Sequence, residues 1–169
     1  STIIQLKDGR IWQLIRTNWA YLYESFSKND GKTWSDPVRT NIDASSSPPA
    51  ILRLKSGRIV LVWNRMYPQD DSDDKFRIRK INLKQAEVPT SWQRDELSIM
   101  SSMDDGKTWT EPKIIAKMNK HSNFEHKHWT SSQLSYPHLF EPTPGVIWVT
   151  TEAGSLRAKI TEDFFEKDN

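Results

Sequence analysis

One sequence pattern occurs twice, as Ser27-Lys28-Asn29-Asp30-Gly31-Lys32-Thr33-Trp34 and as Ser102-Met103-Asp104-Asp105-Gly106-Lys107-Thr108-Trp109. In each copy the acidic or amide side chain can accept hydrogen bonds from backbone N–H groups of its own turn. The glycine can adopt a positive φ, and the tryptophan can fold back as an apolar plug. The pattern therefore predicts a β-hairpin turn with its own small core, and its repetition predicts a repeat architecture.

A second repeated unit consists of an apolar strand, a glycine turn and another apolar strand, and it occupies residues 2–15, 50–63 and 137–150. Such runs on either side of a turn glycine are typical of β-hairpins. We expect each unit to supply the first two strands of a four-stranded sheet. In the first two units, the hairpin that carries the Ser-to-Trp pattern follows and supplies strands three and four. Residues 155–160 are expected to form a third strand after the last unit.

The Ser-to-Trp pattern resembles the Asp-box of the sialidase superfamily, which lies between the third and fourth strands of a β-propeller blade. The second copy matches at every defining position, and the first has an amide, whose oxygen can accept the same bonds. Asp-boxes lie on the outer rim of the propeller, so the resemblance implies a structural role for the acidic residues. The defining positions are Ser27, Asn29, Gly31 and Trp34 in the first copy and Ser102, Asp104, Gly106 and Trp109 in the second.

This resemblance implies an all-β fold, a six-bladed β-propeller in the full protein, of which the chain is a single partial domain. We expect two complete blades, at residues 1–43 and 44–118, and part of a third at 130–169. Residues 67–93 are a polar insertion in the second blade. Because the chain begins inside a strand and ends before a third box, we expect it to belong to a longer protein. An incomplete arc would expose strand edges, which favours self-association.

Composition narrows the classes of partner. The chain has 169 residues, no cysteine, eight tryptophans and a net charge of +2. The basic residues are scattered, so we expect no nucleic-acid partner. No apolar run reaches the length of a membrane span, and the absence of cysteine leaves the compartment open. The family resemblance favours an extracellular or periplasmic location.

Two polar stretches contain residue types that can ligate metal ions. The cluster Asp70-Asp71-Ser72-Asp73-Asp74 lacks the glycine and distal glutamate of an EF-hand loop, which favours a solvated loop. His126 and His128 could ligate a metal from one strand, but no third ligand is suitably spaced. We therefore expect no metal and no cofactor.

The resemblance implies roles for particular arginines. Arg16 ends an apolar strand, at the position where sialidases place an arginine that binds the substrate carboxylate. Arg94 matches the Arg-x-x-Leu strand that leads into an Asp-box, which makes it a second arginine for the same carboxylate. Two guanidinium groups on one carboxylate form paired, charge-assisted hydrogen bonds. Asn64 closes the strand before the insertion and is expected to help shape the pocket.

Tyr136 opens the third hairpin, where sialidases present a tyrosine nucleophile. A neutral phenol is not repelled by the substrate carboxylate, and sialidases are the tyrosine exception among glycosidases. A phenol needs a base, and the family's glutamate would fall at Ser1 or the residue before it; Glu24 is a weak substitute. Glu152 resembles the acidic residue that orients a binding arginine.

The leading hypothesis is a retaining exo-sialidase that acts on terminal sialic acids once the propeller is complete. The family's first arginine, its acid/base aspartate and the glutamate partner belong to earlier blades, so we expect the isolated chain to be nearly inactive. Alternatives are a propeller that binds an acidic carbohydrate or a protein without catalysis, and a glycosidase or lyase for another acidic sugar such as a uronate. Enzymatic activity therefore depends on the complete propeller.

Overall fold

The computed structural model describes residues 1–65, 79–83, 86–90, 94–118, 133–153 and 155–166. This part of the chain is almost entirely β-structure, with one short 3-10 helix, η2 (Glu162–Phe165). The strands are β1 (Thr2–Gln5), β2 (Ile11–Ile15), β3 (Tyr21–Ser27), β4 (Val38–Asp43), β5 (Ala50–Arg53), β6 (Ile59–Trp63), β7 (Arg79–Leu83), β8 (Ala86–Thr90), β9 (Glu96–Ser102), β10 (Lys113–Lys117), β11 (Ser135–Thr143), β12 (Val146–Ala153) and β13 (Arg157–Thr161).

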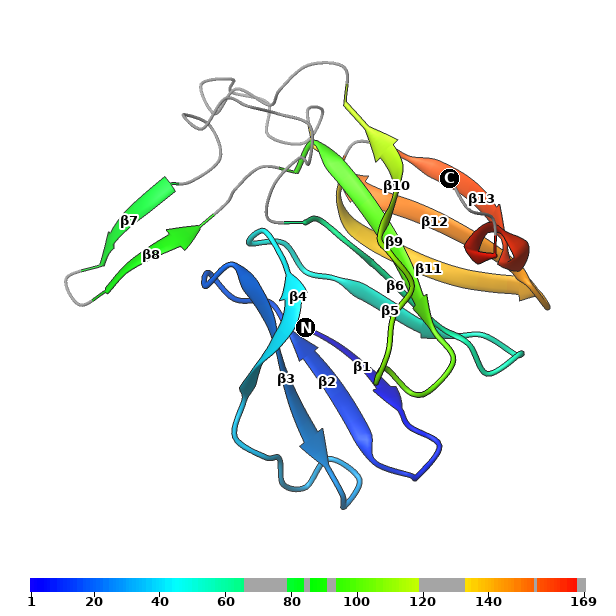
Figure 1. Ribbon diagram of the computed structural model, residues 1–169, viewed down its shortest axis with the longest axis horizontal. Helices are drawn as coiled ribbons and strands as arrows, with labels where there is room; N and C mark the ends of the chain where they lie inside the picture. The colour runs from blue at the N-terminus through cyan, green and yellow to red at the C-terminus, as the bar shows by residue number, and fades with distance from the viewer. Residues whose placement is uncertain (66–78, 84–85, 91–93, 119–132, 154, 167–169) are drawn as a thin grey trace.

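The strands form successive antiparallel sheets, as the repeats predict. The first sheet has the order β1-β2-β3-β4, the second has the order β10-β9-β6-β5, and the third has the order β11-β12-β13. In each sheet a glycine hairpin joins the first two strands, and in the first two sheets an Asp-box lies between strands three and four. The prediction of two complete propeller blades and part of a third is therefore confirmed. Figure 1 shows the three sheets side by side.

The insertion in the second blade contains structure that the sequence analysis did not predict. Strands β7 and β8 pair in register from Arg79 with Thr90 to Leu83 with Ala86 and form a separate two-stranded sheet. β6 and β9 nevertheless pair directly, with Ile59 opposite Ser102. The polypeptide thus leaves the blade after β6 and returns to the same blade at β9.

Strand β6 lies between the two hydrophobic cores, which explains why its sequence is uniformly apolar. Successive side chains of a strand point to opposite faces of its sheet. Ile59, Leu61 and Trp63 belong to the core shared with the first blade, whereas Val60 and Val62 belong to the core shared with the third. All five side chains are buried, so this strand fixes the stacking of the three blades.

The two Asp-boxes form nearly the same network of hydrogen bonds. In the second box, Ser102 donates to Asp104, whose carboxylate accepts the Thr108 N–H and hydroxyl, at distances of 2.8, 2.8 and 2.6 Å. In the first box, the amide oxygen of Asn29 accepts the Thr33 N–H at 2.9 Å, so the amide replaces the carboxylate as expected. Accepting three hydrogen bonds favours the charged carboxylate and lowers the pKa of Asp104 to about 2.

The tryptophans of the two boxes differ in their packing. Trp109 packs against the core shared by the first and second blades. The centre of its ring lies 6.3 Å from the centre of the Trp12 ring. Trp34 remains 40% exposed, and its indole N–H donates to the Gly31 carbonyl within its own turn. Both tryptophans fold back onto the glycine of their own turn as predicted, but of the two Trp109 alone also packs against a hydrophobic core.

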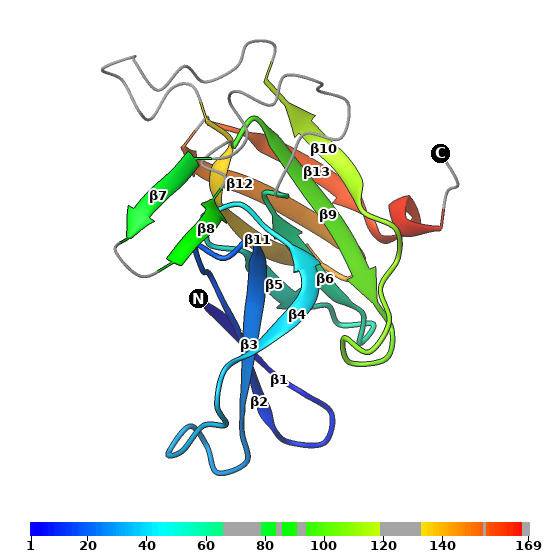
Figure 2. The ribbon, with the colours of Figure 1, turned by 60° about the vertical axis from the view of Figure 1, so that its left-hand side comes forward.

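Opposite ends of the blades carry different features. The glycine hairpins and both Asp-boxes lie at one end, and the ends of β2 and β6 and the starts of β9 and β11 lie at the other (Figures 1 and 2). We call these the box end and the open end. The described residues include no helix that is long and apolar enough to cross a membrane.

Candidate functional site

Arg16 and Arg94 come together at the open end because both bind the loop between β4 and β5. Arg16 follows β2, and its Nε and Nη2 donate to the Ser46 hydroxyl at 3.3 and 3.1 Å. Arg94 precedes β9, and its Nη2 donates to the Ser46 carbonyl at 2.7 Å. One loop residue therefore anchors a guanidinium from each of the first two blades.

Arg94 is the more deeply buried of the two arginines, with 6% of its surface exposed. Its Nη1 donates to Gln133 at 3.3 Å, and its buried Nε has no hydrogen-bond partner among the described residues. Burial lowers the pKa of Arg94, the Tyr136 phenol opposes this shift, and the positive charge of Arg16 adds to it. Within the described ranges, neither guanidinium pairs with a carboxylate. This arrangement leaves positive charge for an anion to neutralise.

Tyr136 lies beside this pair of arginines. The guanidinium carbon of Arg94 is 5.3 Å from the centre of the phenol ring, which is a cation–π distance. A hydrogen bond from Arg94 lowers the pKa of the phenol; burial acts in the opposite direction, and the charges of both arginines lower it further. The backbone of Tyr136 has a φ of 57°, which is unusual for an aromatic residue and is typical of constrained sites.

Asn64 follows β6 and is fully buried. Its side-chain amide donates to the backbone carbonyls of Glu96 and Leu134 at 2.8 and 2.7 Å. It thereby connects the end of β6 to the segments that begin β9 and β11. This contact positions the strands that carry Arg94 and Tyr136.

Glu152 is exposed on β12 and lines a cavity of about 350 Å³ together with Tyr136 and Ser1. The register of β11 and β12, with Ser135 opposite Ala153 and Pro137 opposite Thr151, places Glu152 across from Tyr136. Among the described residues, no ion pair joins Glu152 to Arg16 or Arg94. The strand register and the shared cavity thus place Glu152 beside Tyr136.

Glu24 lies away from Tyr136, so the structure does not support Glu24 as a base for the phenol. Its carboxylate accepts the indole N–H of Trp12 at 2.9 Å. Partial burial raises the pKa of Glu24, and the bond from Trp12 opposes that shift. Glu24 is half-buried on β3 and lines cavities together with Trp12 and Gly106, whereas Tyr136 lines a different cavity.

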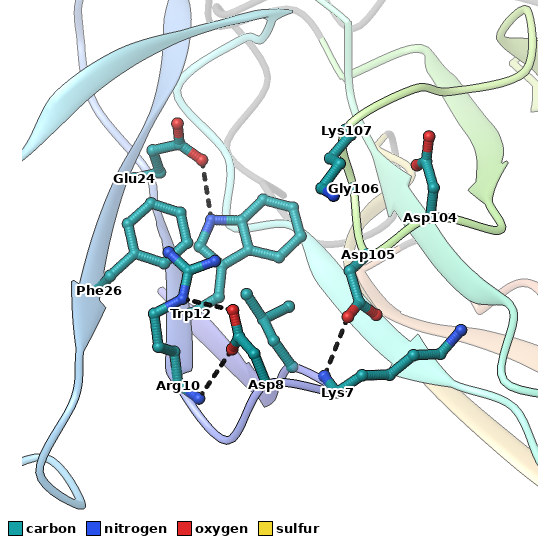
Figure 3. A pocket seen from close by; sticks show the side chains of 11 residues that line it. Lys7, Asp8, Arg10, Trp12, Glu24, Phe26, Asp104, Asp105, Gly106 and Lys107 are labelled. Carbon is teal, nitrogen blue, oxygen red and sulfur yellow. Dashed lines mark hydrogen bonds and ion pairs between the residues drawn. The ribbon is translucent and has the colours of Figure 1, made fainter.

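A larger cavity, of about 580 Å³, lies at the box end between the first hairpin and the second Asp-box (Figure 3). Several of its charged groups are already paired within the protein. Asp8 accepts from Arg10 Nε at 2.8 Å, and Asp105 accepts the backbone N–H of Lys7 at 2.9 Å. The contact between Lys7 and Asp105 joins the first blade to the second, which favours a structural role for this region.

The metal candidates from the sequence, Asp70–Asp74 and the pair His126 and His128, lie outside the described residues. Within the part of the chain that the structure describes, no group of three His, Cys, Asp or Glu side chains is arranged to hold a metal ion.

The sequence analysis missed the two residues that position the arginines, Ser46 and Gln133. Both are buried polar residues, and they lie 48 and 39 positions from Arg94 along the chain. The run Ser45-Ser46-Ser47-Pro48-Pro49 was a usable signal, because small polar residues before prolines favour a fixed loop between blades.

Stacked antiparallel blades with Asp-boxes define a partial β-propeller, and comparison with known proteins places this propeller in a family. The model of the family described as "BNR repeat-like domain" matches residues 1–149, and the chain therefore belongs to that family. No curated protein matches the sequence.

Among solved structures, the chain is similar to the NanB sialidase from Streptococcus pneumoniae, crystallised with 2-[(3-chlorobenzyl)ammonio]ethanesulfonate. The identity is 12% and the TM-score is 0.42. The match covers 95% of this chain and 43% of that sialidase, so the chain spans less than half of its length.

Proposed function

We propose that the open end binds the carboxylate of an acidic sugar, and that a complete propeller containing this chain is a retaining exo-sialidase. The observation that carries the proposal is the convergence of Arg16 and Arg94 on Ser46, without a carboxylate partner among the described residues. An unpaired guanidinium at a 6% exposed position costs free energy, which a bound carboxylate would recover.

Tyr136 is the proposed nucleophile. Its hydroxyl gives its proton to a base as the oxygen attacks the anomeric carbon, a covalent glycosyl–tyrosine bond forms, and the bond to the leaving group breaks. A general acid gives the departing oxygen its proton, and water then hydrolyses the intermediate. Arg94 supports this role because it lowers the pKa of the phenol, which increases the fraction of phenolate at a given pH.

Glu152 is the described carboxylate that we propose as an aid to the tyrosine, since it lines the same cavity. Asn64 supports the site indirectly through its bonds to Glu96 and Leu134. The sugar is a glycan that carries a carboxylate, and sialic acid is the proposed identity.

Arginine variants test the carboxylate site. Arg16→Gln and Arg94→Gln are expected to weaken the binding of N-acetylneuraminic acid about tenfold or more, because each removes charge-assisted hydrogen bonds. Arg10→Gln is the matched control, since Arg10 lies at the box end and pairs with Asp8. Thermal unfolding of each variant identifies losses that come from misfolding. Equal affinity in all three variants and the parent chain would contradict the proposal.

The catalytic part is tested separately, in a protein that carries this chain within a complete propeller. Tyr136→Phe is expected to abolish hydrolysis of a fluorogenic sialoside while leaving the affinity for the free sugar unchanged. Hydrolysis at the parent rate would remove Tyr136 as the nucleophile but would leave the carboxylate site intact.

Binding without hydrolysis is the second candidate function. It is favoured by the absence, among the described residues, of a carboxylate hydrogen bonded to Tyr136, and by the engagement of Glu24 with Trp12. Affinity for an acidic sugar without turnover in the complete propeller would select this function. Competition between sialic acid and glucuronic acid would distinguish a sialic-acid site from a uronate site.

Self-association remains a proposal as well. Large apolar side chains, including those of Ile3, Val38 and Phe140, are more than half exposed on the described surface. Sedimentation of the chain over a range of concentrations tests whether these side chains are covered by a second copy.

A further inference from the structure

The segment that follows β4 is held by both of the first two blades. Ala44 donates its N–H to the carbonyl of Ala20, in the loop between β2 and β3, at 2.9 Å. Ser45 donates its N–H to the carbonyl of Asn64, which follows β6, at 3.0 Å. Ser46 comes next in this segment and is 1% exposed. Backbone contacts with two blades therefore fix the place of Ser46 independently of its side chain.

The Ser46 hydroxyl makes hydrogen bonds in two directions. It donates to the side-chain oxygen of Asn18 at 2.7 Å, and it accepts from Nε and Nη2 of Arg16 at 3.3 and 3.1 Å. A serine hydroxyl has one hydrogen and two lone pairs, and a guanidinium group can only donate. Because Asn18 takes the single hydrogen, the lone pairs are left for Arg16. Asn18 thus fixes the direction in which Ser46 accepts hydrogen bonds.

The loop that carries Asn18 is itself held by local hydrogen bonds, although Asn18 is exposed. The Thr17 hydroxyl donates to the Tyr21 carbonyl at 2.7 Å and accepts the Trp19 N–H at 3.0 Å. Ala20 has a φ of 65°, and this left-handed residue turns the chain back into β3. The side chain of Asn18 is therefore in place before a ligand arrives, which reduces the entropy lost on binding.

The groups that hold Arg16 are electrically neutral. Asn18 and Ser46 carry no charge, and among the described residues no carboxylate forms an ion pair with Arg16. A carboxylate in place of either group would also orient the guanidinium, but it would compete with a ligand for the positive charge. The neutral contacts orient Arg16 and leave its charge for an anionic ligand.

We propose that Asn18 is a positioning residue, which acts through the Ser46 hydroxyl to direct Arg16 toward the carboxylate of an acidic sugar. This inference rests on the proposed function, because it requires Arg16 to bind that carboxylate. Without the Asn18 side chain, the Ser46 hydroxyl can rotate, and Arg16 loses an acceptor of fixed direction. The contact with the carboxylate then weakens, whereas contacts with the rest of the sugar remain.

The experiment measures the binding of N-acetylneuraminic acid and of its methyl ester to the full chain by titration calorimetry. The parent chain is expected to prefer the acid. Asn18→Ala and Ser46→Ala are each expected to reduce this preference about fivefold, with little change in the affinity for the ester. Because both variants break the same hydrogen bond, the double variant is expected to lose no more than Ser46→Ala alone. Asn41→Ala is the matched control, because Asn41 is an exposed asparagine on β4 of the same blade.

The outcomes separate this proposal from the proposed function. If the parent chain binds neither ligand, or binds both equally, the proposed function is wrong and the positioning role is lost with it. If the parent chain prefers the acid and Asn18→Ala keeps that preference, the positioning role is wrong and the carboxylate site stands. If Asn18→Ala weakens the acid and the ester by the same factor, Asn18 only stabilises its loop, which also contradicts the proposal. Losses that add in the double variant would show that Asn18 does not act through Ser46.

Discussion

The packing of the second Asp-box against Trp12 of the first blade predicts that alanine lowers stability more at Gly106 than at Gly31. Gly31 and Gly106 occupy the same position of the repeat and have the same φ of 81°. An added Cβ at Gly31 would lie 3.8 Å from the nearest side-chain atom, in Trp34. An added Cβ at Gly106 would lie 2.7 Å from two ring carbons of Trp12. Alanine is therefore expected to lose the same backbone free energy at both glycines, and only at Gly106 does it also clash with a packed side chain.

The magnitude follows from these distances. Alanine in a left-handed conformation costs about 1–2 kcal/mol at either glycine. At Gly106 the Trp12 ring must also move by about 1 Å to reach normal carbon–carbon contact. Trp12 is 4% exposed, is held by Glu24 and stacks on Phe26, so this movement repacks the core. Overpacking of this kind costs about 1–3 kcal/mol, which is the expected difference between the variants.

Urea unfolding of Gly31→Ala and Gly106→Ala measures the difference, and the slope of the free energy against urea checks that both variants unfold alike. Trp12→Leu combined with Gly106→Ala provides a control. The smaller leucine side chain relieves the contact, so the double variant is expected to lose less stability than the sum of the two single losses. Equal stability of the two alanine variants, within about 0.5 kcal/mol, would refute the packing between the blades.

Three further predictions concern titrating groups. In a spectroscopic titration, the phenol of Tyr136 is expected to ionise at a lower pH than an ordinary tyrosine, and Arg94→Gln is expected to raise its pKa. An unchanged Tyr136 pKa in Arg94→Gln would contradict the contact between the two side chains. Burial raises the pKa of Glu24, so the charged carboxylate lowers the stability of the folded protein once the pH exceeds that pKa. Glu24→Gln should therefore raise the melting temperature at neutral pH and leave it unchanged in acid, and a lower melting temperature at neutral pH would show that the charged form is favoured. The pKa of Asp104 is lowered to about 2, so its contribution to folding stability is complete above the ordinary pKa near 4 and is lost as the pH falls toward 2. Asp104→Asn, which places the residue of the first box in the second, should make the unfolding free energy less dependent on pH between about 4 and about 2, and an unchanged dependence would contradict this.

The sequence was sufficient for the blades because the signals of strands and turns are local. Alternation along a strand, a glycine at each hairpin and the side chains of the Asp-box all act within a few residues. The apolar run of β6 was recognised as a strand for the same reason. Its burial on both faces depends on the neighbouring blades and could be established only from the structure.

The site depended on contacts between residues that are distant in the sequence. Arg16 and Arg94 could be proposed from the blade register, but their common anchor at Ser46 depends on the packing of one blade against the next. The positive φ of Tyr136 could not be predicted from the sequence, because the residue is neither glycine nor asparagine.

The most direct test of the central claim is a calorimetric titration of the parent chain with N-acetylneuraminic acid and with its methyl ester. The two sugars differ in the charge of the group that Arg16 and Arg94 are proposed to bind. The account predicts that the acid binds and that the ester binds at least about tenfold more weakly, with the preference for the acid falling as salt is added. Equal affinity for the acid and the ester would contradict the proposal that this arginine pair is a carboxylate site.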